Sequence, residues 1–111
     1  MRVARQWSLD GEVINNSEVY KLVDNTTLNN LVVSTTTLYP GKQTRGHSHK
    51  DQEEVYIFTK GEGYINLDGK EFLAKEGDVF TIKAKVHHQV RNPHPEFALH
   101  FICVFEGKRN H

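Results

Sequence analysis

Cysteine is nearly missing from this 111-residue chain, because Cys103 is the only one. A single cysteine cannot form a disulfide within the chain, so a reducing compartment is expected. Long apolar runs are missing too. Neither the opening stretch MRVARQWSLDGEV nor any later stretch has the apolar length of a signal peptide or a membrane span. The sequence therefore predicts a soluble, cytoplasmic protein.

An excess of charge of either sign is also absent. Lys plus Arg and Asp plus Glu both number 14, so the formal net charge at pH 7 is zero. A neutral chain has no global field that would attract a polyanion or an anionic lipid surface. We therefore expect neither a nucleic-acid partner nor a membrane partner. The length suits one domain with a modest core.

What the chain does contain is a series of short segments rich in Val, Ile, Thr, Phe and Tyr, separated by turn residues. Eight of these segments are predicted strands: residues 19–23, 31–39, 54–59, 63–67, 70–73, 79–83, 88–91 and 97–105. Asp68-Gly69 is a strong hairpin signal, because a type I′ turn needs positive φ at its central residues. Many short strands at regular spacing predict an all-β antiparallel barrel or sandwich.

The histidines carry most of the functional information. His47 and His49 are one residue apart, and side chains two apart in a strand point to the same face. Glu54 follows a few residues later. Two imidazoles with one carboxylate suit a divalent transition metal such as Mn, Fe, Ni, Co or Zn, and they leave coordination positions open. This stretch therefore predicts a metal site.

A second histidine pair, His87 and His88, ends the β-branched and aromatic run of residues 77–92 and offers a fourth ligand. The residues alone leave two choices open. Strand parity places Glu54 and Glu53 on opposite faces, but the turn at residues 50–52 hides which face continues from His49. His88 competes with His87 in the same way.

Each of the two stretches has a characteristic spacing of glycine, histidine and other polar residues. The first reads G-x5-H-x-H-x4-E-x6-G from Gly41 to Gly61, and the second reads G-x10-H-x3-N from Gly77 to Asn92. This pattern resembles the two motifs of the cupin superfamily, over roughly residues 31–106. The resemblance implies a double-stranded β-helix, or jelly-roll barrel, with one metal in its mouth. The implied ligands are His47, His49, Glu54 and His88.

The resemblance also divides the chain into an N-terminal arm with edge strands at residues 1–30, the barrel at 31–106 and a tail at 107–111. We expect residues 1–16, which are polar, to be a loosely tied arm or an edge strand donated to a neighbour.

One departure from the family concerns the second motif, where cupins usually carry Pro and Gly before the His. Lys83 and Lys85 stand there instead, so the turn should form less rigidly.

The function is harder to predict than the fold, since one scaffold hosts many chemistries. The first hypothesis is an isomerase or epimerase of a small sugar or sugar phosphate, in which the metal polarises an oxygen and Glu54 or Tyr56 moves a proton. The string Glu54-Val55-Tyr56 is similar to that of archaeal cupin-type phosphoglucose isomerases, which have a longer gap before the Glu. The alternatives are a non-haem iron dioxygenase of a small organic acid and a non-catalytic ligand-binding cupin.

Two further expectations concern partners. Five cations flank the ligand segments and predict an anionic small-molecule ligand, although loop lysines can also be ordinary surface: Lys42, Arg45, Lys83, Lys85 and Arg91. Residues 55–58, and residues 99–105 apart from His100, are apolar on both strand faces, so the outer face needs cover. A homodimer is predicted, unless residues 1–20 cover that face.

Parity predicts that Cys103 points inward as an apolar filler.

Overall fold

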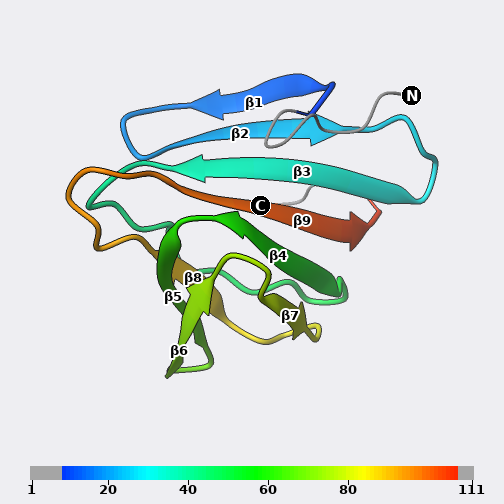
Figure 1. The fold of residues 1–111 in the computed structure, drawn as a ribbon. Helices are drawn as coiled ribbons and strands as arrows, with labels where there is room; N and C mark the ends of the chain where they lie inside the picture. Colours follow the sequence, from blue (N-terminus) through cyan, green and yellow to red (C-terminus); the bar gives the residue numbers. More distant parts are fainter. Residues whose placement is uncertain (1–8, 108–111) are drawn as a thin grey trace.

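The computed structural model describes residues 9–107, which form nine strands and no helix (Figure 1). Within these residues no helix has the length and apolarity needed to cross a membrane. The strands are β1 (Glu12–Asn16), β2 (Tyr20–Asn25), β3 (Leu31–Leu38), β4 (Glu54–Lys60), β5 (Glu62–Leu67), β6 (Lys70–Lys75), β7 (Val79–Ile82), β8 (His88–Arg91) and β9 (Leu99–Glu106). The prediction of an all-β fold is confirmed.

The strands form two antiparallel sheets. The larger sheet has the order β1-β2-β3-β9-β4-β7, and the smaller has the order β6-β5-β8. Figure 1 shows β1, β2, β3 and β9 as one layer, with β5, β6 and β8 on the other side of β4. Buried apolar side chains from both sheets make one core, including Leu38, Phe58 and Phe101 from the larger sheet and Ile65 and Val90 from the smaller.

Strand alternation decides which side chains face this core. Along β4, Glu54, Tyr56 and Phe58 are buried, whereas Val55 and Ile57 are half-buried on the other face. This is the period-two pattern expected of a strand with one buried face, and it confirms the predicted parity of β4. Cys103 on β9 is buried as well, as its parity predicts.

Two turns place the strands that bear the candidate site. Asp68 and Gly69 both have positive φ, 51° and 87°, which confirms the hairpin predicted between β5 and β6. Lys85 has φ 72°, in the left-handed region that glycine adopts without cost. Its N–H donates to the carbonyl of His49, and the turn leads directly into β8. The turn thus forms without glycine, at the cost of a strained lysine.

The N-terminal segment contributes an edge strand to the larger sheet. Residues 12–16 form β1, which pairs with β2 of the same chain and contains a bulge between Val13 and Asn15. In this chain it is therefore an edge strand of the larger sheet. All five of its residues are exposed, so no alternation of apolar side chains marks it in the sequence. Residues 1–8 lie outside the described part of the chain.

Candidate metal centre

The two histidine-bearing segments meet at one point. His47 and His88 form an isolated antiparallel bridge, in which each backbone N–H donates to the carbonyl of the other residue. Glu54 is the first residue of β4, and His88 is the first residue of β8. The structure brings together the four side chains predicted as ligands. One ligand atom from each of His47, His49, Glu54 and His88 lies within 4.8 Å of every other.

The four donors form a compact, largely buried cluster. The Nε2 of His49 lies 2.7 Å from Oε1 of Glu54, and the Nε2 of His88 lies 3.5 Å from the same oxygen. The ring centroids of His47 and His88 are 4.4 Å apart. His49, Glu54 and His88 are buried, whereas His47 is half-buried. The centre is therefore largely shielded from water.

Backbone carbonyls orient two of the imidazoles. Nδ1 of His47 lies 3.2 Å from the carbonyl oxygen of Arg45, and Nδ1 of His88 lies 3.1 Å from that of Val86. Because a carbonyl can only accept, each Nδ1 carries the proton, and the lone pair lies on Nε2. A carbonyl bound to the second ring nitrogen is the usual support of a metal-ligating histidine. The donor set fits a divalent transition metal, with three imidazoles and one carboxylate.

The electrostatics of the cluster favour the protonation states that a metal requires. Burial lowers the pKa of His47, and the charges of His88 and His49 lower it further, although the Arg45 carbonyl acts in the opposite direction. Burial alone would raise the pKa of Glu54, but hydrogen bonding with His88 and the positive charges that the three imidazoles carry when protonated bring it below its usual value. A neutral His47 and an ionised Glu54 are ready to bind a cation without first losing protons.

The two competing residues lie elsewhere. Glu53 is exposed and borders a groove on the outer side of β4 and β7. His87 is exposed, and its ring lies directly over Gly46, where a Cβ would collide with it. The backbone N–H of His87 donates to Oδ1 of Asp68 at 2.8 Å. His87 therefore belongs to the rim of the barrel.

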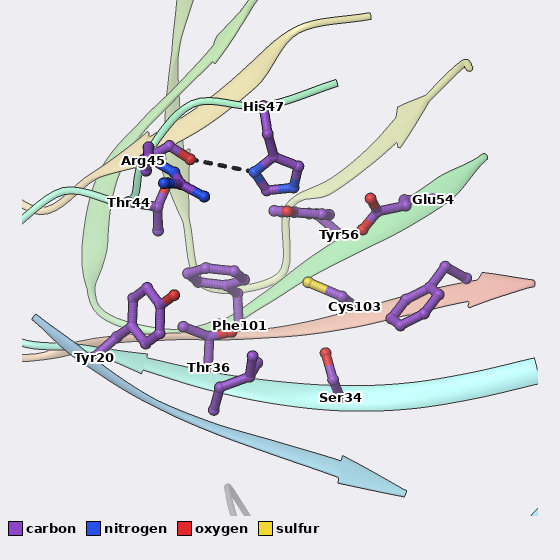
Figure 2. A pocket seen from close by; sticks show the side chains of 12 residues that line it. Tyr20, Ser34, Thr36, Thr44, Arg45, His47, Glu54, Tyr56, Phe101 and Cys103 are labelled. Atoms are coloured by element: carbon purple, nitrogen blue, oxygen red, sulfur yellow. Dashed lines mark hydrogen bonds between the residues drawn. The ribbon is translucent and has the colours of Figure 1, made fainter. Parts of the chain in front are cut away.

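A cavity of about 170 Å³ opens beside the centre and is lined by His47 and Glu54 (Figure 2). Its apolar lining comes from Leu22, Phe101, Cys103 and Phe105. Tyr56 also lines it, stacked on Phe101 with ring centroids 5.3 Å apart, and its ring meets that of His88 edge-on at 5.6 Å. A compound in this cavity would touch the exposed side of the metal centre and Tyr56 together.

The five predicted rim cations are dispersed by the fold. Arg45 lines the cavity. Lys42, Lys83 and Lys85 are exposed and are not among the lining residues, and Lys83 borders the outer groove instead. Arg91 lies on the outer face of the smaller sheet, 3.0 Å from Glu71 and above the ring of Tyr64. Of the five, only Arg45 is placed to meet a ligand in this cavity.

Sequence reasoning missed the hydroxyl groups of the cavity wall. Four further residues with hydroxyl side chains line it: Tyr20, Ser34, Thr36 and Thr44. A signal was present in β3, LVVSTTTL, where Ser34 and Thr36 share the inner face with Val32 and Leu38. Small polar residues on the core face of a strand indicate a polar cavity, because buried polar groups need partners.

Comparison with known proteins agrees with this geometry. The family model of the cupin domain matches residues 34–105. An uncharacterized protein of Methanocaldococcus jannaschii is 36% identical over 52 residues, a segment that spans 47% of this chain and 42% of that protein. The chain thus matches less than half the length of this curated relative.

Solved structures resemble almost the whole chain. An RmlC-like cupin from Shewanella frigidimarina has a TM-score of 0.78 at 20% identity, covering 99% of this chain and 97% of that one. A predicted oxalate decarboxylase from Thermotoga maritima has a TM-score of 0.76 at 23% identity, covering 95% and 98%. A candidate sugar phosphate isomerase from Acidithiobacillus ferrooxidans has a TM-score of 0.69 at 18% identity, covering 79% and 60%.

At these identities the structural likeness establishes the fold and no activity. The match of the family model is a stronger argument, because it covers both histidine-bearing segments and five of the nine strands from end to end. It starts at Ser34 in β3 and ends at Phe105 in β9, two neighbouring strands of the larger sheet. The chain therefore belongs to the cupin domain family.

Proposed function

We propose that the chain is a metal-dependent isomerase or epimerase that acts on a small sugar-like carbonyl compound. The observation that carries this proposal is the single cavity that joins Tyr56 to the exposed side of the four-donor centre. A divalent metal held by His47, His49, Glu54 and His88 would supply Lewis-acid polarisation of a substrate oxygen. The chain's own residues must then bind the substrate and move a proton.

Tyr56 is the residue best placed to move that proton. It is buried, it lines the cavity, and its ring is fixed between Phe101 and His88. A side chain held by packing on two sides offers its hydroxyl at a defined position, which general acid–base catalysis requires. Glu54 faces the same cavity, so its carboxylate contributes charge beside the reacting group.

The apolar part of the lining assists this chemistry. Phe101, Cys103 and Phe105 exclude water from one wall, and electrostatic interactions are stronger where water is excluded. The fold of the candidate sugar phosphate isomerase is similar, which agrees with the proposal without deciding the substrate.

Hydrogen exchange with solvent tests the proposal. The metal-loaded protein is incubated in D2O with small aldoses, ketoses and keto acids, and NMR detects deuterium at the carbon next to the carbonyl. We expect Tyr56→Phe to slow this exchange by about 10²-fold or more while metal content stays constant. Tyr64→Phe is the matched control, because Tyr64 lies on the outer face of the smaller sheet beneath Arg91.

Other outcomes would point to the alternative functions. Oxygen consumption by the Fe(II)-loaded protein without deuterium exchange would favour a dioxygenase of a small organic acid. Tight ligand binding with neither exchange nor oxygen consumption would favour a binding protein. Exchange that is equally fast in Tyr56→Phe and in the unmodified protein would remove Tyr56 from the mechanism.

A further inference from the structure

We infer that the cavity recognises a small hydroxylated carboxylic acid, with a ligand hydroxyl at Ser34 and the carboxylate at Arg45. The inference rests on the proposed function, since the cavity is the one beside the metal centre, and it narrows the sugar-like carbonyl compounds to those that also carry a carboxylate. In Figure 2 Arg45 lies above the cavity and Ser34 below it, while Tyr56 and Glu54 lie along its upper right.

Ser34 carries the first part of the argument. It lies on β3, is 1% exposed and lines the cavity, and its Oγ is buried with no hydrogen-bond partner in the structure. In Figure 2 this oxygen points from β3 toward the cavity. A buried hydroxyl without a partner costs free energy, so such groups in native proteins call for an explanation. A ligand hydroxyl supplies the missing partner.

The surroundings of Ser34 favour a hydroxylated ligand. Thr36 is the next residue on the same face of β3, and Tyr20 on β2 lines the same wall. A hydroxyl group can both donate and accept, so a row of them matches a ligand that carries hydroxyl groups of its own. Phe101 and Phe105 provide apolar surface for the carbon skeleton of that ligand.

The charge of the cavity favours a carboxylate over a phosphate. Among residues 9–107, Arg45 is the only Lys or Arg that lines the cavity. A guanidinium group binds a carboxylate through two parallel hydrogen bonds. A phosphate dianion is commonly held by several cations or by a helix N-terminus, and residues 9–107 contain no helix. One arginine matches the single charge of a carboxylate.

The volume limits the size of this acid. A cavity of about 170 Å³ has room for about five or six water molecules at roughly 30 Å³ each. A skeleton of about three or four carbons with its polar groups therefore fits this space. Glycerate is a suitable probe, because lactate lacks only its 3-hydroxyl group and glyceramide lacks only its charge. Lactate and glycerate share the same α-hydroxy carboxylate, so a difference between them does not arise from chelation of the metal.

Calorimetric titration of these probes into the Mn(II)-loaded protein tests the inference. We expect glycerate to bind more tightly than lactate, and Ser34→Ala to reduce that preference by about three- to tenfold. Thr35→Ala should leave the preference unchanged, because Thr35 is the neighbour on the outer face of β3. Arg45→Gln should weaken both acids by about tenfold and leave glyceramide unaffected.

A second measurement separates recognition from a structural role. Ser34→Ala removes a buried hydroxyl without a partner, so the unfolding temperature of the metal-loaded protein should hold or rise. A fall in the unfolding temperature together with an unchanged ratio of glycerate to lactate would mean that Ser34 supports only the fold, and would overturn the inference.

The remaining outcomes are also decisive. The inference is wrong if no probe binds, if Ser34→Ala keeps the full preference, or if glycerol phosphate binds more tightly than glycerate. A separate titration of Mn(II) reads the metal centre alone. If the chain binds no metal, the proposed function fails. In that case the ratio of glycerate to lactate affinity, measured for the metal-free unmodified protein and for metal-free Ser34→Ala, tests the inference separately from the proposed function.

Discussion

The two ends of the barrel interior are built from the same strands but differ in chemistry. Along the inner face of β4, Glu54 at the metal centre is followed by Tyr56 and then by the fully buried Phe58. Along β8, His88 is followed by Val90. The open end, at Glu54 and His88, buries ionisable groups, which costs free energy. The closed end, at Phe58 and Val90, buries aromatic and aliphatic groups, which stabilises the fold. Stability should therefore come from the closed end and function from the open end.

The largest effect on stability is expected from truncation at the closed end. The ring of Phe58 is fully buried and contacts the rings of Phe80 and Phe101, at centroid distances of 5.8 and 5.2 Å. Phe58→Ala should lower the free energy of unfolding by about 3–5 kcal/mol, measured by equilibrium denaturation in urea. Phe72→Ala, at a half-buried position on β6, should cost clearly less. Equal losses would mean that the closed end is not the main source of stability.

The outer face of the larger sheet differs from both ends of the interior. Four half-buried apolar residues lie there in register on neighbouring strands: Val55, Ile57, Ile102 and Val104. The predicted homodimer would bury this face. Ile57→Lys combined with Ile102→Lys should then convert a dimer into a folded monomer, as measured by sedimentation velocity and circular dichroism. Leu73→Lys on the smaller sheet is the control. A monomeric unmodified protein, or a double variant that stays dimeric, would contradict the prediction.

A smaller effect is expected at the turn that carries the open end. Lys85 has φ 72° and is exposed, so Lys85→Gly should relieve strain and raise the free energy of unfolding by about 1 kcal/mol. The backbone N–H that donates to His49 is kept. Lys83→Gly, where φ is not positive, should instead lower stability. No gain in Lys85→Gly would mean that the strain is relieved elsewhere.

The smallest expected effect is a pH dependence of the folding stability. It arises at His100 on β9, which belongs to neither end of the barrel interior. Burial lowers the pKa of His100, and the charge of Lys60 lowers it further. The unfolded chain therefore takes up this proton at a higher pH than the folded chain. The stability due to a neutral His100 is complete above the unfolded pKa of about 6.5, and it is lost as the pH falls below that value.

Unfolding free energies measured between about pH 8 and about pH 5 check this prediction. His100→Gln should lose less stability over that range than the unmodified protein does. His100→Gln also removes the contact between His100 Nδ1 and Thr37 Oγ1, which are 3.2 Å apart. The loss of this contact should lower the stability equally at every pH in that range. A difference between the two proteins that does not change with pH would contradict the account.

Much of the fold could be predicted because local patterns determine it. Strand parity, the Asp68-Gly69 hairpin and the spacing of the histidines are all short-range features, and the parity of β4 correctly set Glu54 apart from Glu53. The choice between those two depended on family resemblance, since residues 48–53 contain no strand and parity is lost across them. β1 was missed because its exposed residues give no periodic signal.

The cavity wall could not be predicted from spacing alone. Which cations reach a ligand depends on how distant segments pack, and Arg91 illustrates this: its strand parity turns it outward to Glu71. Ser34 and Thr36 were interpreted only as strand-forming residues. Their position on an inner face opposite Cys103 and Phe101 arises from the pairing of β3 with β9, which are more than sixty residues apart.

The most direct test of the metal centre is a calorimetric titration of divalent transition metals into metal-stripped protein. The unmodified chain should bind one ion, and so should Glu53→Gln and His87→Ala, whose side chains lie outside the cluster. Glu54→Gln and His88→Ala should bind at least about a hundredfold more weakly. If either of these variants binds like the unmodified chain, or if Glu53→Gln or His87→Ala loses the ion instead, the four-donor centre is not where the metal is held.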